Sequence, residues 1–223
     1  VCKRRQVNVD LHASITLREF GIQWDIDGMC NRATSFPLAG RQVSCLCHDD
    51  LMLVLCANGA KDGWDGLDRV CDVAALIRNT NEREGINWER MFAVAEQAGM
   101  TRMLAVGLWL ARELFSSPLP EGVEARVQSD TATQRIGSHL LDRLLSKPSN
   151  PDSRVRRAWL YLQLRERWHD RARCCLEHLR PGVGDWAALP LPAPLRFLHY
   201  PIRPLRLISR YGIELFQRPG GVP

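Results

Sequence analysis

The chain has 223 residues, 45% of them hydrophobic and 25% charged. This length is sufficient for one large domain or two small ones, each with a hydrophobic core. No apolar run reaches the roughly 18 residues that a membrane-spanning helix needs, and the N-terminus lacks the apolar segment of a signal peptide. The eight cysteines show no disulfide-framework spacing, so we expect reduced thiols in a cytoplasmic protein that does not contact a membrane.

The net charge of +5 is distributed unevenly along the chain. Residues 151–223 hold thirteen Arg, no Lys and six acidic residues, which is a net charge of +7, so residues 1–150 carry about −2. Any basic surface is therefore expected in the C-terminal third.

The first predicted element is a strand near the N-terminus. Val7, Val9 and Leu11 alternate with polar residues, which gives the strand one apolar and one polar face. Asp10 and His12 lie on the polar face, and a strand carboxylate is a good Mg²⁺ ligand when other carboxylates converge on it. Taken alone, the pattern favours an Asp10 that faces solvent.

A short helix over residues 25–32 and a second strand around residues 43–47 follow. The sequence Asp25-Ile26-Asp27 has the form of a D-x-D metal motif, but it follows no strand and no Gly-Ser phosphate loop precedes it. Acidic residues are favoured at the start of a helix, where they face free backbone N–H groups. We therefore interpret both carboxylates as helix-start residues.

Residues 48–77 are expected to form two buried helices joined by a tight turn. Leu51–Ala57 is apolar on every side, so the first helix should be covered all round. Asp49 or Asp50 is suited to its start, where a carboxylate accepts hydrogen bonds from free backbone N–H groups.

The second helix of this pair places apolar residues at spacings of three and four along one face: Leu67, Val70, Cys71, Ala74 and Ile77. Asp72 lies inside this run. Burial of an ionised carboxylate there would destabilise the fold by several kcal/mol unless a partner compensates its charge. Lys61, in the turn region that Gly59 and Gly63 mark, is the nearest cation in sequence. The two residues are either a buried ion pair that ties the helices together or part of a binding site.

Every convincing element after residue 48 is a helix. Further helices are expected at residues 88–98, 101–115, 131–146, 153–179 and 204–216, with a loop at 119–128. The predicted fold is mainly α, with an α+β remnant in which one or two N-terminal strands precede a multi-helix bundle. We expect three parts: residual strands and a connector at 1–47, a helical domain at 48–118 and a basic helical region at 119–223.

The sequence Cys45-x-Cys47-His48 offers three metal ligands. A zinc site needs four, usually as two spaced pairs, and no second cluster in the sequence supplies the rest. We therefore expect no metal at this position.

The Arg-rich helix within residues 154–173 could bind nucleic acid, with Trp159 and Trp168 stacking on bases. The helical spacing of these tryptophans with Leu160 and Leu164 favours core positions instead. We prefer a solvated arginine face, and nucleic acid is not the expected partner.

Three segments taken together resemble a known family: VDLH at 9–12, HDDLMLVLCANGAKDGWDGLDRVCDVAAL at 48–76 and WERMFAVAEQAGMTRMLAVGLWLARELFSSPLPEGV at 88–123. They resemble the uncharacterised nucleotidyltransferase family of the DNA-polymerase-β-like superfamily. Its members carry a V-D/E-L-H-W strand and an L-L-x-x-L-C-x-H-G-A-K-H-x-W-x-x-L-x-x-x-x-D-v-a segment. The C-terminal LPLPAPLRFLHYPIRPLRLISRYG is similar to that family's closing LP…LRPlRL…KYG.

In that superfamily a Gly-Ser loop holds the triphosphate, and three carboxylates bind two Mg²⁺ ions and activate an acceptor hydroxyl. The resemblance implies that Asp10 is the third carboxylate, a catalytic residue and Mg²⁺ ligand. It also implies that His12, Lys61 and Asp72 are nucleotide-binding residues, the last two near the phosphates. The implied reaction moves a nucleotidyl group from an NTP to an acceptor that the sequence does not identify.

The chain departs from the family pattern at several places. The family's H-G-A-K-H reads N-G-A-K-D at residues 58–62, and Ala13 replaces the Trp after V-D-L-H. The Gly-Ser loop and the D-x-D strand, which supply two of the three metal carboxylates, are absent and would precede Val1. A two-metal mechanism cannot run on one carboxylate, so we expect an incomplete or inactive enzyme.

Two other functions are kept as alternatives. The first is a non-catalytic helical module that binds a protein partner or forms a homo-oligomer. The second is nucleic-acid binding through the Arg-rich helix at residues 154–173.

Overall fold

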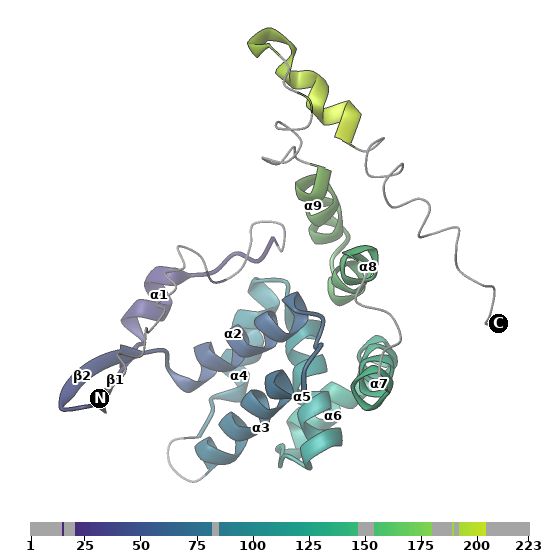
Figure 1. Ribbon diagram of the computed structural model, residues 1–223. Coiled ribbons are helices and arrows are strands. Elements are labelled where there is room, and N and C mark those ends of the chain that lie inside the picture. Colours follow the sequence, from purple (N-terminus) through teal and green to yellow (C-terminus); the bar gives the residue numbers. More distant parts are fainter. Residues whose placement is uncertain are drawn as a thin grey trace, which may run out of the picture.

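The computed structural model describes Ile15, residues 21–81, 85–146, 154–179, Leu189 and residues 192–203. Within these ranges the chain forms α-helices and one β-hairpin, so the predicted mainly α fold is confirmed (Figure 1). None of the helices in these ranges is long and apolar enough to cross a lipid bilayer. The predicted strand near Asp10 and the predicted helix at 204–216 lie outside the described residues.

Helix α1 (Ile26–Asn31) begins at Asp25, whose carboxylate accepts a hydrogen bond from the Gly28 N–H at 3.0 Å. Asp27 occupies its first turn. The interpretation of both residues as helix-start acids is therefore confirmed, and the hydrogen bond explains why the helix begins where it does.

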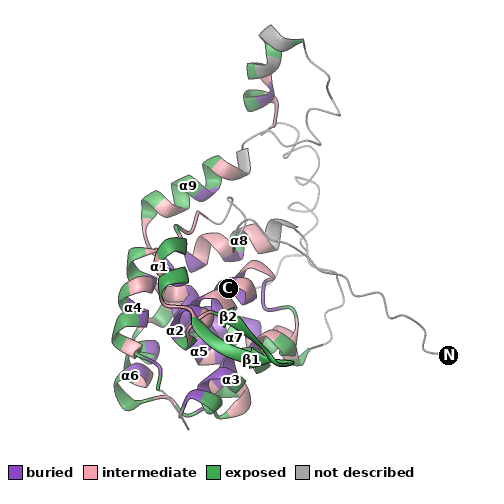
Figure 2. Ribbon diagram, turned by 90° about the vertical axis from the view of Figure 1, so that its left-hand side faces the viewer, coloured by how far each residue is buried: buried purple, intermediate pink, exposed green. Residues whose placement is uncertain are grey.

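Strands β1 (Thr34–Leu38) and β2 (Arg41–Cys45) follow as an antiparallel hairpin in which Phe36 pairs with Val43. All ten strand residues are exposed. The hairpin stands away from the helical bundle in Figure 1 and is exposed along its whole length in Figure 2. The second strand was predicted slightly later, at residues 43–47.

Helix α2 (His48–Lys61) lies at the centre of the bundle and packs against α3 (Leu67–Asn81), α4 (Trp88–Gln97), α5 (Thr101–Phe115) and α8 (Arg154–Leu164). None of the residues Leu51–Ala57 is exposed. Leu51, Val54 and Leu55 are only partly buried, so the prediction that this helix is covered all round holds on three sides and only partly on the fourth.

The core-facing side of α3 differs from the prediction. Val70, Val73, Ala74 and Ile77 are buried, whereas Leu67 is 47% exposed and Cys71 is also exposed. The predicted and observed buried faces share Val70, Ala74 and Ile77. They differ on one side of the helix, where Val73 is buried in place of Leu67 and Cys71. Spacing alone cannot decide the flank, because that depends on where α2 and α5 lie.

The ends of α4 and α5 follow local signals. The Asn87 side chain accepts a hydrogen bond from the Arg90 N–H, Gly99 ends α4 with φ +64°, and Ser116 closes α5 in a left-handed conformation. Both predicted helices are confirmed.

Helix α6 (Glu121–Ser129) occupies the segment predicted as a loop, and that prediction is wrong. Pro120 stands at its N-cap, where the absence of an N–H costs nothing, and Val123 and Val127 are buried beside α5. Helix α7 (Thr131–Leu145) then packs against α5, with Ile136 and Leu140 buried as predicted.

The long helix predicted at 153–179 is two helices, α8 and α9 (Trp168–Leu179), separated by residues 165–167. Arg102 donates to the carbonyl of Gln163 at 3.0 Å, and Arg171 donates to the carbonyl of Arg165 at 2.8 Å. These side-chain donors satisfy carbonyls that a continuous helix would pair with its own N–H groups. A 3₁₀-helix follows at Ala193–Leu198, and residues 199–203 continue as helix.

Candidate functional site

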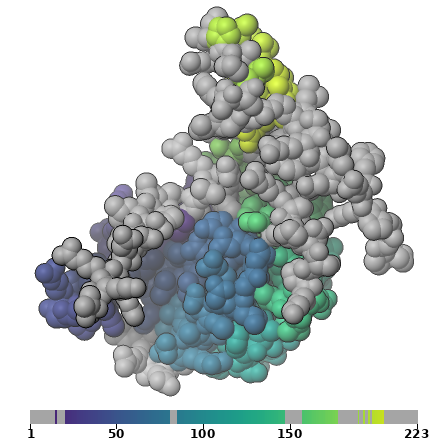
Figure 3. All heavy atoms as spheres, viewed as in Figure 1, coloured from purple at the N-terminus to yellow at the C-terminus, as the bar shows by residue number. Residues whose placement is uncertain are grey.

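The site residues predicted from the sequence fall into two groups. Asp10 and His12 lie outside the described residues. Lys61 and Asp72 are described: Lys61 ends α2, and Asp72 lies in the second turn of α3. We call residues 59–72, which include both, the α2–α3 turn. Helix α3, blue in Figure 3, forms part of the surface that faces the viewer.

The α2–α3 turn is held in one shape by a buried tryptophan. Trp64 is 1% exposed, has φ 55°, and donates its backbone N–H to the Gly59 carbonyl at 2.8 Å. A Cβ at Gly59 would lie 2.5 Å from the Trp64 ring, and one at Gly107 would lie 3.0 Å from it. Gly59 is therefore needed for the close approach of this ring, and the packing fixes where Lys61 leaves the helix.

Lys61 is the last residue of α2 and its side chain is 30% exposed. Its Nζ lies 3.8 Å from Asp62 Oδ1, while Asp62 Oδ2 lies 2.9 Å from Arg69 Nη2. The Tyr161 hydroxyl donates to the Lys61 carbonyl, which joins α8 to the end of α2. Asp62 is closer to Arg69 than to Lys61. The Lys61 ammonium can therefore still donate hydrogen bonds to a ligand.

Asp72 is exposed on α3. The prediction that it is buried in the apolar run is wrong, because the core-facing side of the helix passes through Val73 and Ala74 instead. No ion pair between Lys61 and Asp72 occurs within the described residues. Asp72 follows Arg69 by three positions, so the two side chains are neighbours on the helix surface.

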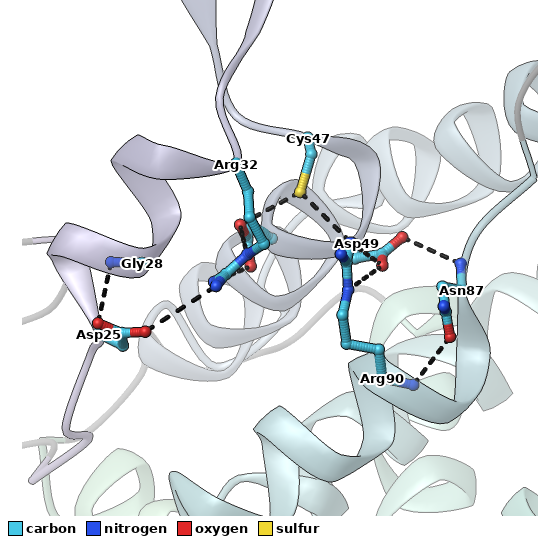
Figure 4. Close-up of polar contacts among 8 residues, drawn as sticks. Asp25, Gly28, Arg32, Cys47, Asp49, Asn87 and Arg90 are labelled. Atoms are coloured by element: carbon cyan, nitrogen blue, oxygen red, sulfur yellow. Dashed lines mark hydrogen bonds and ion pairs between the residues drawn. The ribbon is translucent and has the colours of Figure 1, made fainter.

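A second polar cluster lies at the other end of α2 and was not predicted (Figure 4). Asp49 and Asp50 are 5% and 2% exposed. The prediction that one of them caps α2 is wrong, because Cys47 is the N-cap residue and no side chain among the described residues caps this helix. Asp49 accepts from Arg90 Nε at 3.0 Å and from the Asn87 N–H at 3.1 Å. Asp50 accepts from Arg32 Nε at 3.0 Å and Arg32 Nη2 at 3.1 Å.

The two carboxylates tie neighbouring elements to α2. Arg32 follows α1 and Arg90 belongs to α4, so each buried charge is compensated by an arginine from another element. The hydrogen bond to Asp50 raises the pKa of Arg32. In the sequence, the only sign of this cluster is a pair of adjacent acidic residues at the start of an apolar helix. That sign does not predict which arginines pair with them.

Cys47 lies between these two pairs. Its thiol donates to Asp50 Oδ2 at 3.2 Å, and burial together with this bond to an acidic neighbour raises its pKa. Cys45 and His48 are exposed. In the described part of the chain, no group of three or more His, Cys, Asp or Glu side chains is arranged to hold a metal ion.

A cleft of about 290 Å³ opens beside the Arg32–Asp50 pair. Its apolar wall comes from α1, α2 and α4: Met29, Leu53, Val94 and Ala98. Its polar wall consists of Gln23, Trp24, Asp25, Arg32, Asp50 and Gln97. The cleft therefore combines an apolar floor, one indole ring and a rim of hydrogen-bonding groups.

The Arg-rich segment was the third candidate. Trp159 and Trp168 are 60% and 79% exposed, so the prediction that they belong to the core is wrong, while Leu160 and Leu164 are buried as expected. Several of its arginines bond backbone carbonyls at the break between α8 and α9: Arg165 to Gly99, Arg167 to Glu96 and Arg171 to Arg165. These arginines have structural contacts, and nucleic-acid binding stays the less favoured alternative.

Comparison with known protein families gives a match. A family model described as an uncharacterised nucleotidyltransferase matches residues 1–116, from the N-terminus to the end of α5. Searches of curated proteins and of solved structures give no significant match. The matched part includes the α2–α3 turn, both buried carboxylates and the cleft.

Proposed function

Because the chain belongs to the uncharacterised nucleotidyltransferase family, whose model matches residues 1–116, we propose that it takes part in transferring a nucleotidyl group from an NTP to an acceptor. In such a transfer an acceptor oxygen attacks the α-phosphorus, and the bond from that phosphorus to the bridging oxygen breaks. Pyrophosphate leaves with the electron pair, and the acceptor proton passes to solvent. The family match is the observation that carries the proposal.

In this proposal the α2–α3 turn binds the nucleotide. Lys61 donates to a phosphate oxygen, since its ammonium is partly exposed and its closest carboxylate among the described residues, Asp62, is 3.8 Å away. A carboxylate repels phosphate, so Asp72 instead accepts a hydrogen bond from a hydroxyl or amine of the nucleotide. Arg69 lies between them, where it already holds Asp62.

Asp10 remains the proposed catalytic residue and Mg²⁺ ligand, with His12 beside it, because it matches the acidic position of the V-D-L-H strand. Asp10 and His12 lie outside the described residues, and within the described part of the chain no group of three or more His, Cys, Asp or Glu side chains is arranged to hold an ion. No step of the reaction is therefore derived through the metal.

Equilibrium dialysis with ATP, GTP, CTP and UTP, each with Mg²⁺, tests the nucleotide site. Lys61→Met should raise the Kd of the preferred NTP about tenfold or more, which corresponds to one charge-assisted hydrogen bond. Arg135→Met is the control, because Arg135 is an exposed cation on α7, eight residues before Arg143, the α7 residue that pairs with Asp65 of the turn. Binding of no NTP, or equal effects of the two substitutions, would overturn the site.

Asp72 can be tested in the same assay together with a melting curve. Because its side chain is exposed, Asp72→Asn should leave the melting temperature unchanged and weaken nucleotide binding. A lower melting temperature with unchanged affinity would assign Asp72 a structural role instead.

The hairpin favours a second candidate function, binding of a protein partner. Phe36, Leu38 and Val43 are 55%, 58% and 39% exposed and share one face of the two-stranded sheet. A two-stranded hairpin is marginally stable alone, and contiguous exposed apolar groups mark interaction surfaces. Light scattering that shows association, lost in Phe36→Ser, would support a homo-oligomer; a monomer at all concentrations would count against it.

A further inference from the structure

The cleft and Lys61 cannot bind the same small chemical group. Asp50, in the cleft wall, and Lys61 lie eleven residues apart on α2. At a rise of about 1.5 Å per residue they are about 16 Å apart along the helix axis. If the α2–α3 turn binds the phosphates of the nucleotide, the cleft is available for a second ligand.

The charges in the cleft disfavour phosphate. Arg32 is the only cation among the lining residues, and two of its donors already bond Asp50. Asp25 and Asp50 give the lining a net negative charge. An anion placed there would meet two carboxylates and a guanidinium that is already compensated, so the ligand is neutral or cationic.

One gap in the cleft has the geometry of a hydroxyl site. Arg32 Nη1 and Asp25 Oδ2 lie 3.9 Å apart, which is too far for a direct hydrogen bond (Figure 4). A ligand hydroxyl both accepts and donates, so a single hydroxyl can accept from Nη1 and donate to the carboxylate. Neither a carbonyl nor an ammonium group can make both of these bonds.

The rest of the wall suits a ring that carries several hydroxyls. Gln23 and Gln97 provide amides that both donate and accept, and Trp24 provides an aromatic face. Val94 and Ala98 are only partly buried, and they form an apolar surface against which the C–H face of a ring can pack. The volume of about 290 Å³ fits one small ring system and excludes a folded polymer.

We propose that this cleft binds a polyhydroxylated ring, a furanose or pyranose, and that this ring is a part of the acceptor that lies away from the hydroxyl that attacks the α-phosphorus. The second clause rests on the proposed function, whereas the first depends only on the geometry of the cleft. One hydroxyl bridges Arg32 Nη1 and Asp25 Oδ2 from the side of the pair, within hydrogen-bonding distance of both, and the ring packs on Trp24.

Saturation-transfer NMR in the absence of NTP tests the binding, with D-glucose, D-ribose and adenosine at millimolar concentration as probes. The 223-residue chain should transfer saturation to the ring protons of at least one sugar or to the ribose protons of adenosine. Asp25→Asn should raise the Kd of that probe about tenfold, because the amide that faces the ligand no longer accepts from the hydroxyl. Trp24→Leu should abolish the transfer.

Asp27→Asn is the matched control, because Asp27 is exposed in the first turn of α1 and does not line the cleft. It should bind every probe like the unmodified chain. Asn is also a good N-cap residue, so Asp25→Asn should keep α1 folded. Should that variant unfold, Trp24→Leu decides the matter by itself.

Three results would overturn the assignment: no transfer to any probe, unchanged transfer in Trp24→Leu, or transfer confined to the base protons of adenosine. The nucleotide assay separates the two proposals. Sugar binding without NTP binding would leave the cleft site standing and remove its role as acceptor site. NTP binding without sugar binding would leave nucleotidyl transfer standing and remove the sugar site.

Discussion

Arg32 and Asp50 form a two-point ion pair, with Nε 3.0 Å from Oδ2 and Nη2 3.1 Å from Oδ1. The Asp50 side chain is 3% exposed and that of Arg32 is 28% exposed. The pair joins the segment after α1 to the start of α2, and it also forms one wall of the cleft. It therefore connects the stability of the bundle with the shape of the candidate acceptor site.

Arg32→Met should lower the free energy of unfolding by about 3 kcal/mol, because it leaves the buried Asp50 carboxylate without its cation. Urea unfolding followed by circular dichroism measures the loss. The double variant Arg32→Met, Asp50→Leu should recover most of it, since a buried ion pair can be replaced by apolar groups of similar size.

Arg69→Met is the control for this pair. Arg69 binds Asp62 at 2.9 Å, but both side chains are about one-third or more exposed, at 42% and 33%. An exposed pair contributes about 0–1 kcal/mol, so this variant should be nearly as stable as the unmodified chain. Similar losses in Arg32→Met and Arg69→Met would contradict the assigned role of Asp50.

Gly59→Ala should destabilise the chain by about 1–3 kcal/mol, the usual cost of overpacking a core. The added Cβ would lie 2.5 Å from the buried Trp64 ring, which has little room to move. Gly122→Ala is the matched control, because nothing lies within 4 Å of its Cβ position in α6. Its higher helix propensity should leave stability unchanged or slightly raised. Thermal melting of both variants distinguishes them.

Local signals were sufficient to predict much of the fold. The side chains of Asp25 and Asn87 cap the starts of α1 and α4, and Gly99 ends α4. The ends of these helices could therefore be predicted within a few residues. Leu51–Ala57 is apolar on all sides, and all seven residues are buried or partly buried. In each case the cause lies within one or two helical turns of the residue concerned.

The candidate site was less predictable because its contacts connect distant residues. Asp49 pairs with Arg90, 41 residues away, and Asp50 with Arg32, 18 residues away. The break between α8 and α9 depends on Arg102, which is 61 residues from the Gln163 carbonyl that it binds. No local pattern specifies such partners, and the same holds for the flank of α3 that exposes Asp72.

The cysteines should differ in reactivity toward alkylating reagents, and the more deeply buried thiols should react more slowly. Complete burial raises the pKa of the Cys56 thiol to about 12, so almost no thiolate forms near neutral pH. Cys47 is half-buried, and its pKa is raised by burial and by its bond to Asp50. Cys45 is exposed on β2.

Iodoacetamide treatment followed by peptide mass spectrometry should therefore modify Cys45 first, Cys47 more slowly and Cys56 only after unfolding. Modification in urea is the control, because all three thiols should then react alike. Rapid labelling of Cys56 in the folded chain would show that the contact between α2 and α5 opens readily.

Asp130 gives a prediction about acid stability. Partial burial tends to raise the pKa of this carboxyl, but hydrogen bonds from Arg102 and Thr133 outweigh that effect, and the pKa is lowered below its ordinary value of 3.8. A lowered pKa in the folded chain means that the carboxylate stabilises the fold above the ordinary pKa. This contribution is lost as the pH falls through the lowered value.

Asp130→Asn should therefore reduce the free energy of unfolding at about pH 6 and reduce it less at about pH 3, where the unmodified side chain is itself becoming protonated. Arg102 Nε lies 2.9 Å from Asp130 Oδ2 and joins the starts of α5 and α7. Arg102→Met should thus remove most of the same pH dependence. Denaturant unfolding at both pH values measures the difference, and an equal effect of Asp130→Asn at the two values would show that the carboxylate is not held by Arg102.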